Sequence, residues 1–218
     1  MDGIEHFWNQ GDAITRLVAS VLILMSISAW FVIVWKGWLL NRVRCDIGRA
    51  VQAFWTSPSF SAGRERINAL DREQAVRPLV EASLAAPAQD TLEAQGQSDS
   101  QLTRRLRDAL LGVVAQLQFG QVLLASIGST APFIGLLGTV WGIYHALLGI
   151  SAAGSLSIDR VAGPVGESLV MTAAGLAVAI PSVLAYNIFG KMVAVSEAEL
   201  EGFAHDLRDL AARPLPRH

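Results

Sequence analysis

Residues 17–35 read LVASVLILMSISAWFVIVW and contain no Asp, Glu, Lys or Arg. At ~1.5 Å per helical residue, this stretch has the length needed to cross the ~30 Å hydrocarbon core of a bilayer. It is followed by Trp35, Lys36, Gly37 and Trp38, not by the small residues of a signal-peptide cleavage site. The stretch therefore predicts a membrane-spanning helix that is retained in the protein.

Two further apolar stretches lie later in the chain. Residues 109–158 contain no charged residue, and residues 161–190 contain only Glu167. The whole chain is 52% apolar and 17% charged, which is rich in hydrophobic residues for one soluble domain. No stretch of useful length alternates between polar and apolar residues as strands do. We therefore expect an all-α integral membrane protein with three transmembrane helices and long helical cytoplasmic extensions.

Basic residues beside the first span predict its orientation, because cytoplasmic flanks carry an excess of Lys and Arg. Only Arg16 precedes the span closely, whereas Lys36, Arg42, Arg44 and Arg49 follow it. The N-terminus is therefore predicted to lie outside. The predicted segments are an outer N-terminus at 1–16, spans at 17–35, 129–150 and 163–189, a helical cytoplasmic domain at 36–128, an outer loop at 151–162 and a cytoplasmic C-terminal helix at 190–218.

Apolar residues at helical spacing organise the predicted cytoplasmic domain. One set continues the first span inward as helix, and it consists of Val43, Ile47, Val51 and Phe54. A second set predicts one amphipathic helix, and it consists of Ile67, Leu70, Leu79 and Leu84. The composition of residues 85–100 is typical of a linker. We expect the next helix to start near Gln101 and to enter the long uncharged stretch, whose first part is predicted to be a cytoplasmic extension of the second span.

Small residues mark one face of the second and third spans. Glycine recurs every seven residues in the second, and Gly138 adds a small pair with Gly142. Such faces let helix backbones approach closely in lipid. Helix packing is the simpler interpretation, and a narrow interior or a sliding interface is the alternative. Because one three-span chain cannot bury both faces alone, they also predict a ring of several copies. The two sets are Gly128, Gly135, Gly138, Gly142 and Gly149, and Ser168, Thr172, Gly175, Ala179 and Ser182.

Polar side chains within the spans are the candidate functional residues. Counting inward along the two antiparallel spans places Thr139 and Thr172 near the middle of the membrane. Glu167 is the one carboxylate within a predicted span, and it lies close to the outer interface. It is either an acidic residue that favours a helix N-terminus or a polar entrance group of a proton or ion path. His145 falls at a similar depth and is interpreted as an interfacial histidine.

Several functional classes lack their sequence signatures. A net charge of −2 gives no basic patch for nucleic acid, and a single cysteine, Cys45, cannot form a disulfide within the chain. The glycine-rich stretch at 128–139 has no lysine to complete a phosphate loop. The four histidines do not have metal-ligand spacing, and no activated nucleophile is visible. We therefore expect neither catalytic residues nor a metal or other cofactor.

Three motifs together resemble the proton-channel family of ExbB, TolQ and MotA. They are APFIGLLGTVWGIY at 131–144, VAGPVGE at 161–167 and TAAGLAVAIPSVLAYN at 172–187. Within the family, residues 158–167 resemble ExbB more than TolQ. The sequence departs from the family pattern at Leu137, where Phe is common, and at Tyr144 and His145, where Met-Asn or Met-His occurs.

The resemblance implies a homopentamer in the bacterial inner membrane with periplasmic N-termini. Its second and third spans would enclose the transmembrane helices of a small single-span partner, ExbD, and TonB would be a further partner. The complex would couple the proton motive force to TonB-dependent transport across the outer membrane. By motif position, Thr139 and Thr172 resemble the polar pore threonines and Glu167 the family glutamate.

Other readings fit less well. TolQ shares the core motifs and would instead serve envelope constriction in the Tol-Pal system. MotA-type stators carry two spans ahead of their cytoplasmic domain, whereas this chain has one. A purely structural membrane scaffold would need the small faces but no hydroxyls at mid-membrane, and a membrane-surface enzyme would need a catalytic cluster within residues 36–108, where none is visible.

A test of the predicted topology uses single cysteines in a Cys45→Ala background. Gly154→Cys, in the predicted outer loop, should react with a membrane-impermeant thiol reagent added from outside. Gly96→Cys, in the predicted cytoplasmic linker, should react only after the membrane is opened. The reverse labelling pattern would overturn the orientation.

Overall fold

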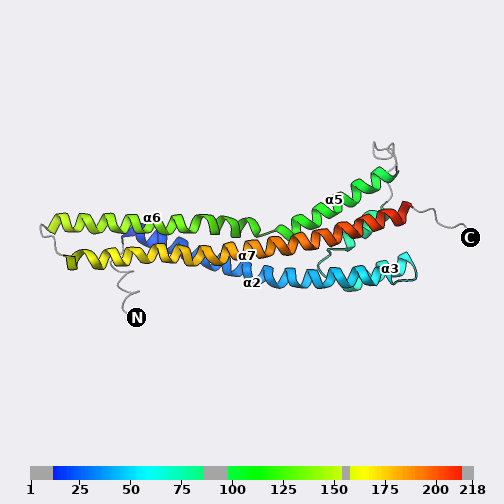
Figure 1. Ribbon diagram of the computed structural model, residues 1–218, viewed down its shortest axis with the longest axis horizontal. Coiled ribbons are helices and arrows are strands. Elements are labelled where there is room, and N and C mark those ends of the chain that lie inside the picture. Colours follow the sequence, from blue (N-terminus) through cyan, green and yellow to red (C-terminus); the bar gives the residue numbers. More distant parts are fainter. Residues whose placement is uncertain (1–11, 86–97, 154–157, 213–218) are drawn as a thin grey trace, which may run out of the picture. The chain divides into compact units, whose positions relative to one another are not determined.

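The structure, a computed structural model, describes residues 12–85, 98–153 and 158–212 (Figure 1). All regular elements in these ranges are helices, so the all-α prediction is confirmed for the described residues. They are α2 (Ala13–Trp55), α3 (Phe60–Leu70), α4 (Arg77–Leu84), α5 (Ser98–Gln118), α6 (Gln121–Ala153) and α7 (Ile158–Ala212). The predicted linker at 85–100 lies largely outside the described residues. Of the predicted outer loop at 151–162, residues 154–157 lie outside them, whereas α6 includes 151–153 and α7 includes 158–162.

Three helices are long and apolar enough to cross a membrane. These candidate spans lie within Ala13–Trp55, Gln121–Gly149 and Ala162–Ala211. The prediction of three transmembrane helices is therefore supported by length and composition. The individual boundaries at 17–35, 129–150 and 163–189 stay predictions.

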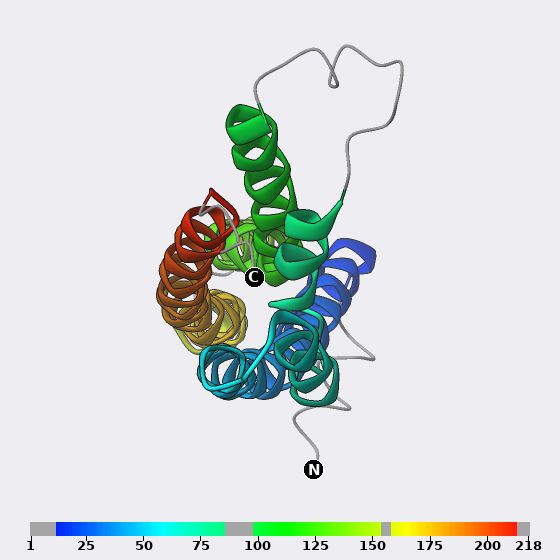
Figure 2. The same ribbon diagram turned by 90° about the vertical axis from the view of Figure 1, so that its right-hand side faces the viewer.

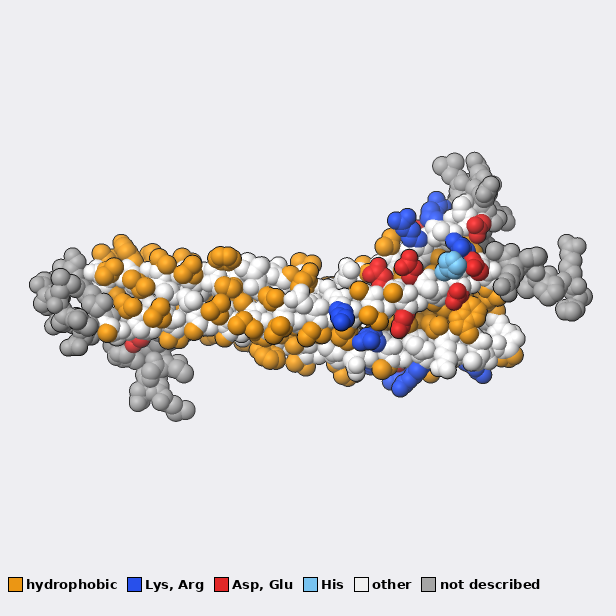
Figure 3. All heavy atoms as spheres, in the orientation of Figure 1, with side chains coloured by type: hydrophobic (Ala, Val, Ile, Leu, Met, Phe, Trp, Pro, Cys, Tyr) orange, Lys and Arg blue, Asp and Glu red, His pale blue; other side chains and the backbone are white. Residues whose placement is uncertain are grey.

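The chain divides into two compact units. One comprises the chain up to Trp35 together with Gly120–Ile188, and we call it the span unit. The other comprises Lys36–Phe119 and the chain from Phe189 onward, and we call it the charged unit. On the face drawn in Figure 3, hydrophobic side chains cover the part formed by α6 and the first half of α7, and Lys, Arg, Asp and Glu side chains gather on the charged unit.

In the span unit, α6 and the first half of α7 run side by side (Figure 1), and their backbones touch. A Cβ atom added at Gly135 would lie 2.6 Å from the carbonyl oxygen of Met171. One added at Gly175 would lie 2.5 Å from the carbonyl oxygen of Ala131. Real Cβ atoms essentially never come this close to another heavy atom. Only glycine fits at the two positions.

The other glycines of α6 extend this seam. An added Cβ would meet Val183 at Gly128, Ser168 at Gly142, and both Met171 and Val18 at Gly138. Gly149 has no atom within 4 Å of the added Cβ in the described part. Most of the glycine face is thus filled within one chain, by α7 and α2. The glycines therefore do not by themselves indicate an interface between copies.

The charged unit has its own core of large side chains. Its buried residues include Leu40, Ile47, Leu79 and Leu200. The Phe54 ring packs edge-on against Phe60 and Phe203, each with ring centroids 5.4 Å apart. Figure 2 shows α4 beside α5, and both helices belong to this unit.

The prediction of one amphipathic helix from Ile67 to Leu84 is wrong, because the chain turns between α3 and α4. The turn is held by Asp71, whose buried carboxylate accepts hydrogen bonds from the backbone N–H groups of Ala75, Val76 and Arg77 at 2.7–2.9 Å. A side-chain oxygen at this position satisfies N–H groups that have no partner within the new helix. Pro78, in the first turn of α4, also favours a helix start.

The helix predicted to start near Gln101 is α5, which enters the uncharged stretch and ends at Gln118. The helix breaks between α5 and α6, where Gly120 has a φ of +83°, a left-handed conformation that glycine adopts without strain. In the charged unit, the Nζ of Lys36 donates to the carbonyl oxygen of Phe119 at 2.5 Å. A cation at this position is favourable, because the last carbonyl groups of a helix carry partial negative charge.

The backbone contact between α6 and α7 generates a stability prediction. Gly175→Ala should lower the free energy of unfolding by about 1–3 kcal/mol, because the added methyl group overpacks a closed seam. Thermal unfolding of the detergent-purified protein, followed by circular dichroism, measures the effect. The control is Gly202→Ala in the same helix, where no atom lies within 4 Å of the new Cβ. Equal stability of the two variants would show that the seam is not as close as described.

Candidate functional site

Two hydroxyl groups meet between α6 and α7 in the span unit. The Oγ1 atoms of Thr139, on α6, and Thr172, on α7, lie 2.6 Å apart. Thr139 is 5% exposed, whereas Thr172 is half-buried. The structure thus brings together the two threonines that sequence analysis placed at similar depth, and it leaves Thr172 as the more accessible member.

The glycine seam explains why these hydroxyls come so close. Thr139 lies one helical turn after Gly135 and three residues before Gly142, and both glycines pack against α7. Small residues on both sides of Thr139 keep the two helix backbones near each other at its level. A threonine side chain is short, so its hydroxyl reaches the facing helix only if the backbones approach this closely.

Thr139 also lies within hydrogen-bond distance of two carbonyl oxygens. Its Oγ1 is 3.0 Å from the carbonyl oxygen of Ser168 on α7 and 3.2 Å from that of Gly135 on its own helix. A threonine hydroxyl has one proton to donate and two lone pairs to accept. Because carbonyl groups only accept, the Thr139 proton goes either to a carbonyl oxygen or to Thr172.

Two hydrogen-bond arrangements follow from this count. If Thr139 donates to the Ser168 carbonyl, Thr172 can donate to Thr139, and the lone pairs of Thr172 are left to accept. If Thr139 donates to Thr172, the Thr172 proton is left to point elsewhere. The pair can therefore offer either an acceptor or a donor at Thr172 without any movement of the backbone.

Ser168 is a site residue that the sequence analysis placed only in a small-residue stripe. It is buried, and its hydroxyl donates to the carbonyl oxygen of Pro164 at 2.8 Å. Its side chain lies against Gly142, and its carbonyl group faces Thr139. The seven-residue glycine spacing predicted the face of α6 that packs against Ser168. Nothing in the sequence indicated that the Ser168 carbonyl oxygen would lie beside Thr139.

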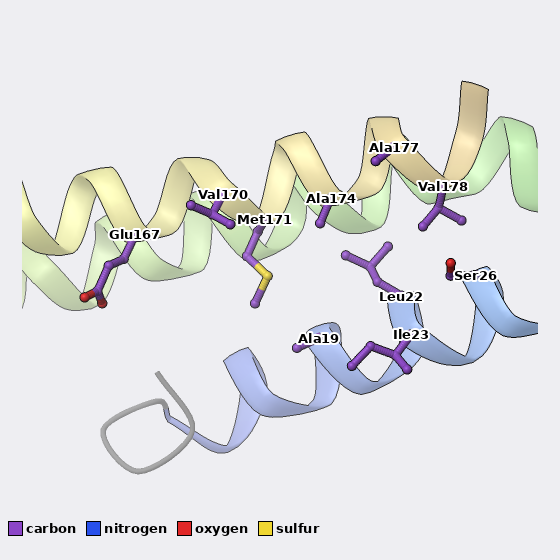
Figure 4. Close-up of a pocket in the computed structure, with 10 residues that line it drawn as sticks. All are labelled: Ala19, Leu22, Ile23, Ser26, Glu167, Val170, Met171, Ala174, Ala177 and Val178. Atoms are coloured by element: carbon purple, nitrogen blue, oxygen red, sulfur yellow. The ribbon is translucent and has the colours of Figure 1, made fainter. Parts of the chain in front are cut away.

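Glu167 lies on a different face of α7 from the threonine pair. Five helical residues separate it from Thr172, which corresponds to about 140° around the helix at ~100° per residue. Its exposed side chain lines a groove between α2 and α7 (Figure 4). The structure does not bring the Glu167 carboxylate to the two hydroxyls.

His145 belongs to a small polar cluster at the start of α2. The indole Nε1 of Trp141 donates to the Asp12 carboxylate at 3.1 Å, and the Nε2 of His145 lies 3.6 Å from the same oxygen. The hydrogen bond from Trp141 is the main reason that the pKa of Asp12 is lowered, and the N–H of Ala13 adds to it. Asp12 is not among the candidate residues of the sequence analysis. Its signal was its position just before a helix, where an acidic residue is favourable.

No group of three or more His, Cys, Asp or Glu residues that could hold a metal ion occurs among the described residues. The arrangement at Thr139 and Thr172 can accept and donate hydrogen bonds in an apolar environment. It offers no group there that binds or releases a proton near neutral pH.

The MotA/TolQ/ExbB proton channel family matches residues 71–202. The chain is 41% identical to the biopolymer transport protein ExbB of Xanthomonas campestris pv. campestris strain B100, with 96% of this chain and 88% of that protein covered.

Two further relatives have the same name. The chain is 37% identical to the biopolymer transport protein ExbB of Neisseria meningitidis serogroup A, with 94% of both chains covered. It is 30% identical to that of Pseudomonas putida, with 95% of this chain and 63% of that protein covered. These likenesses support the ExbB branch over the TolQ alternative. The chain belongs to the MotA/TolQ/ExbB proton channel family.

Proposed function

We propose that this chain is the channel subunit of an ExbB-type complex in the bacterial inner membrane, with its N-terminus in the periplasm. Several copies, five by resemblance to the family, would form a ring around the membrane helix of a small ExbD-like protein. With a TonB-like partner, the complex would use the proton motive force to drive transport across the outer membrane. In this function the chain is a channel subunit and not an enzyme.

The observation that carries the proposal is a hydroxyl pair in spans that lack titratable groups at the same depth. The middle third of each predicted span contains no Asp, Glu, His, Lys or Arg. Hydroxyl groups pass hydrogen bonds but hold no proton charge near neutral pH. A proton that crosses at this depth therefore needs a titratable group from another chain. A carboxyl group on the partner helix would supply it.

The two hydrogen-bond arrangements at Thr139 and Thr172 match the two protonation states of such a carboxyl group. A protonated carboxyl would donate to Thr172, which would donate to Thr139, which would donate to the carbonyl group of Ser168. An ionised carboxylate would accept from Thr172, which would accept from Thr139 at the observed 2.6 Å. Rotation of two O–H bonds exchanges the arrangements.

The arrangement in which Thr172 donates would lower the free energy of the ionised partner carboxylate. A charge at the bilayer centre costs roughly 2.5–3.5 kcal/mol on insertion scales, and a hydrogen bond to a charged group returns about 1.5–3 kcal/mol. One donor at Thr172 would therefore offset much of the cost of the carboxylate. The position of Glu167, near the outer end of α7 and apart from the hydroxyls, fits a role at the proton entrance better than direct exchange with the pair.

The surfaces of α6 and α7 fit an assembly of several copies. In the span unit, large apolar side chains on both helices are exposed in the single chain, among them Phe133, Leu136, Leu169 and Val170. They lie outside the filled glycine seam, so neighbouring copies or lipid would cover them. The ring interface we propose is therefore built from these larger side chains.

Substitution of each threonine tests the hydroxyl function. Thr172→Val, which removes the hydroxyl at nearly constant volume, should lower proton flux at least about ten-fold, because a hydrogen bond to a charged group is lost. Thr139→Val should lower it less, because Thr139 acts through Thr172. The measurement is proton flux in liposomes that contain this chain and its small partner, with co-purification of the partner as the check of assembly.

Two variants serve as controls for this test. Thr172→Ser keeps the hydroxyl and should retain flux within about three-fold. Ser182→Ala removes another buried hydroxyl of α7, whose hydrogen bond at 2.8 Å stays within its own helix, and should leave flux unchanged. Normal flux in Thr172→Val, or equal flux from this chain without any partner, would contradict the proposed proton path.

A further inference from the structure

One carboxylate joins the start of α2 to α6 in the span unit. The Oδ2 atom of Asp12, the residue before α2, accepts a hydrogen bond from the indole Nε1–H of Trp141 at 3.1 Å. The Nε2 of His145, one helical turn further along α6, lies 3.6 Å from the same oxygen. The other oxygen of Asp12 accepts from the N–H of Ala13 at 2.7 Å. The carboxylate thus satisfies an N–H group in the first turn of α2 while it faces two donors on α6.

The state of the His145 imidazole decides what its contact with Asp12 contributes, because 3.6 Å is too long for a hydrogen bond. A neutral imidazole places either an N–H group or a lone pair at Nε2. Only the N–H group attracts the carboxylate, and it brings no net charge. A protonated imidazole always places an N–H group there and adds a positive charge. Protonation of His145 therefore converts a weak contact into an ion pair.

Asp12 is ionised over the pH range in which histidine gains a proton. Its pKa lies below the ordinary 3.8, mainly because Trp141 donates to it and then because the N–H of Ala13 does. The charges of His145 and Arg16 lower the pKa of Asp12 further. Histidine changes its charge between about pH 5 and about pH 8. The two side chains are therefore oppositely charged near pH 5, and the attraction is lost as the pH rises toward 8.

The other charged or titratable side chains around this contact differ from His145. Arg16, one turn after Asp12 on α2, keeps its charge throughout this pH range. Tyr144 packs against His145 on α6 with ring centroids 5.7 Å apart, and phenol groups are neutral in this range. Glu167 is the one charged side chain described on α7 in the span unit, and it faces α2. Among the described side chains of the span unit, His145 is the only imidazole.

The polar contact adds to an apolar contact between the same two helices. Val18, six residues after Asp12, is 2% exposed, and a Cβ atom added at Gly138 on α6 would lie 3.0 Å from its side chain. Helix α2 thus touches α6 at two levels, and only the level at Asp12 contains a group that titrates near neutral pH. Strengthening the polar contact favours the closed state of both levels.

We infer that Asp12 and His145 form a pH-sensitive restraint, which holds the start of α2 more tightly against α6 when His145 is protonated. Trp141 positions the carboxylate in both states, because its N–H group does not titrate. In the orientation proposed above, this end of the spans faces the periplasm, from which the protons enter. The restraint would therefore tighten as the proton concentration on that side rises.

Thiol labelling of Val18→Cys in a Cys45→Ala background tests how often this contact opens. The full chain in its co-purified complex reacts with a small uncharged thiol reagent. Each rate is divided by that of Leu17→Cys, because this exposed neighbour reports the effect of pH on the thiol reaction itself. The ratio should be about 1.5- to 5-fold lower near pH 5 than near pH 8, the range that an exposed ion pair supplies. An equal or higher ratio near pH 5 would overturn the inference.

Two substitutions assign the pH dependence to the pair. Asp12→Asn keeps an acceptor for Trp141 and for the first turn of α2 but loses the charge. His145→Gln keeps a donor that does not titrate. Each should remove the pH dependence of the labelling ratio, and thermal unfolding checks that both variants fold. If the pH dependence persists in His145→Gln, another group such as Glu167 titrates and the inference is wrong.

A second histidine of the chain supplies the matched control. His205 lies 3.6 Å from Asp209 in a similar pair, but both residues belong to α7 in the charged unit. His205→Gln should therefore keep the full pH dependence of the labelling ratio, and its loss in this variant would contradict the assignment to His145. None of these measurements depends on proton flux, so the proposed channel function can fail or hold independently.

Discussion

The contact between the α6 and α7 backbones at Gly135 and Gly175 is the constraint on which the span unit depends. In a bilayer no water drives apolar helices together, so two helices associate closely only where small side chains let their backbones meet. An added methyl group at either glycine would lie within about 2.6 Å of a carbonyl oxygen of the facing helix. This approach sets the distance at which every other side chain between α6 and α7 must fit.

The threonine pair depends on the same approach. Buried hydroxyl groups in an apolar environment need hydrogen-bond partners, since an unsatisfied polar group is costly there. Thr139 finds its partners across the seam, in Thr172 and the carbonyl group of Ser168. Wider spacing would leave both hydroxyls to bond only within their own helices. The packing therefore fixes the chemistry of the site.

Uncharged apolar stretches predicted the three spans, and residue spacing predicted the small-residue faces, because each of these depends on local sequence. The sequence also placed Thr139 and Thr172 at similar depth, since depth follows from counting residues along antiparallel spans. It could not show that their hydroxyls touch, which depends on the rotation of each helix. The same limit applies to Glu167, whose depth was predicted but whose face, toward α2, was not.

The error in the predicted cytoplasmic helices has a local physical origin. Apolar residues on both sides of Asp71 were assigned to one amphipathic helix. The Asp71 carboxylate accepts three hydrogen bonds from backbone N–H groups at the start of α4. It thereby caps α4 and starts a new helix. Such a capping interaction is a property of one side chain, and an average over many residues does not detect it.

The chain passes between the two units at three places, and these differ in whether a helix continues through them. Two of them lie within the helices α2 and α7, each of which continues through the boundary. The third lies at Gly120, where the helical ladder is interrupted. In the charged unit, the fully buried Lys36 bonds to the Phe119 carbonyl group just before this break. Burial of a lysine is costly unless its charge is compensated, and the end of α5 supplies oxygen and partial negative charge. The Phe119 carbonyl group thus has a hydrogen-bond donor from α2 at the point where the helix is interrupted.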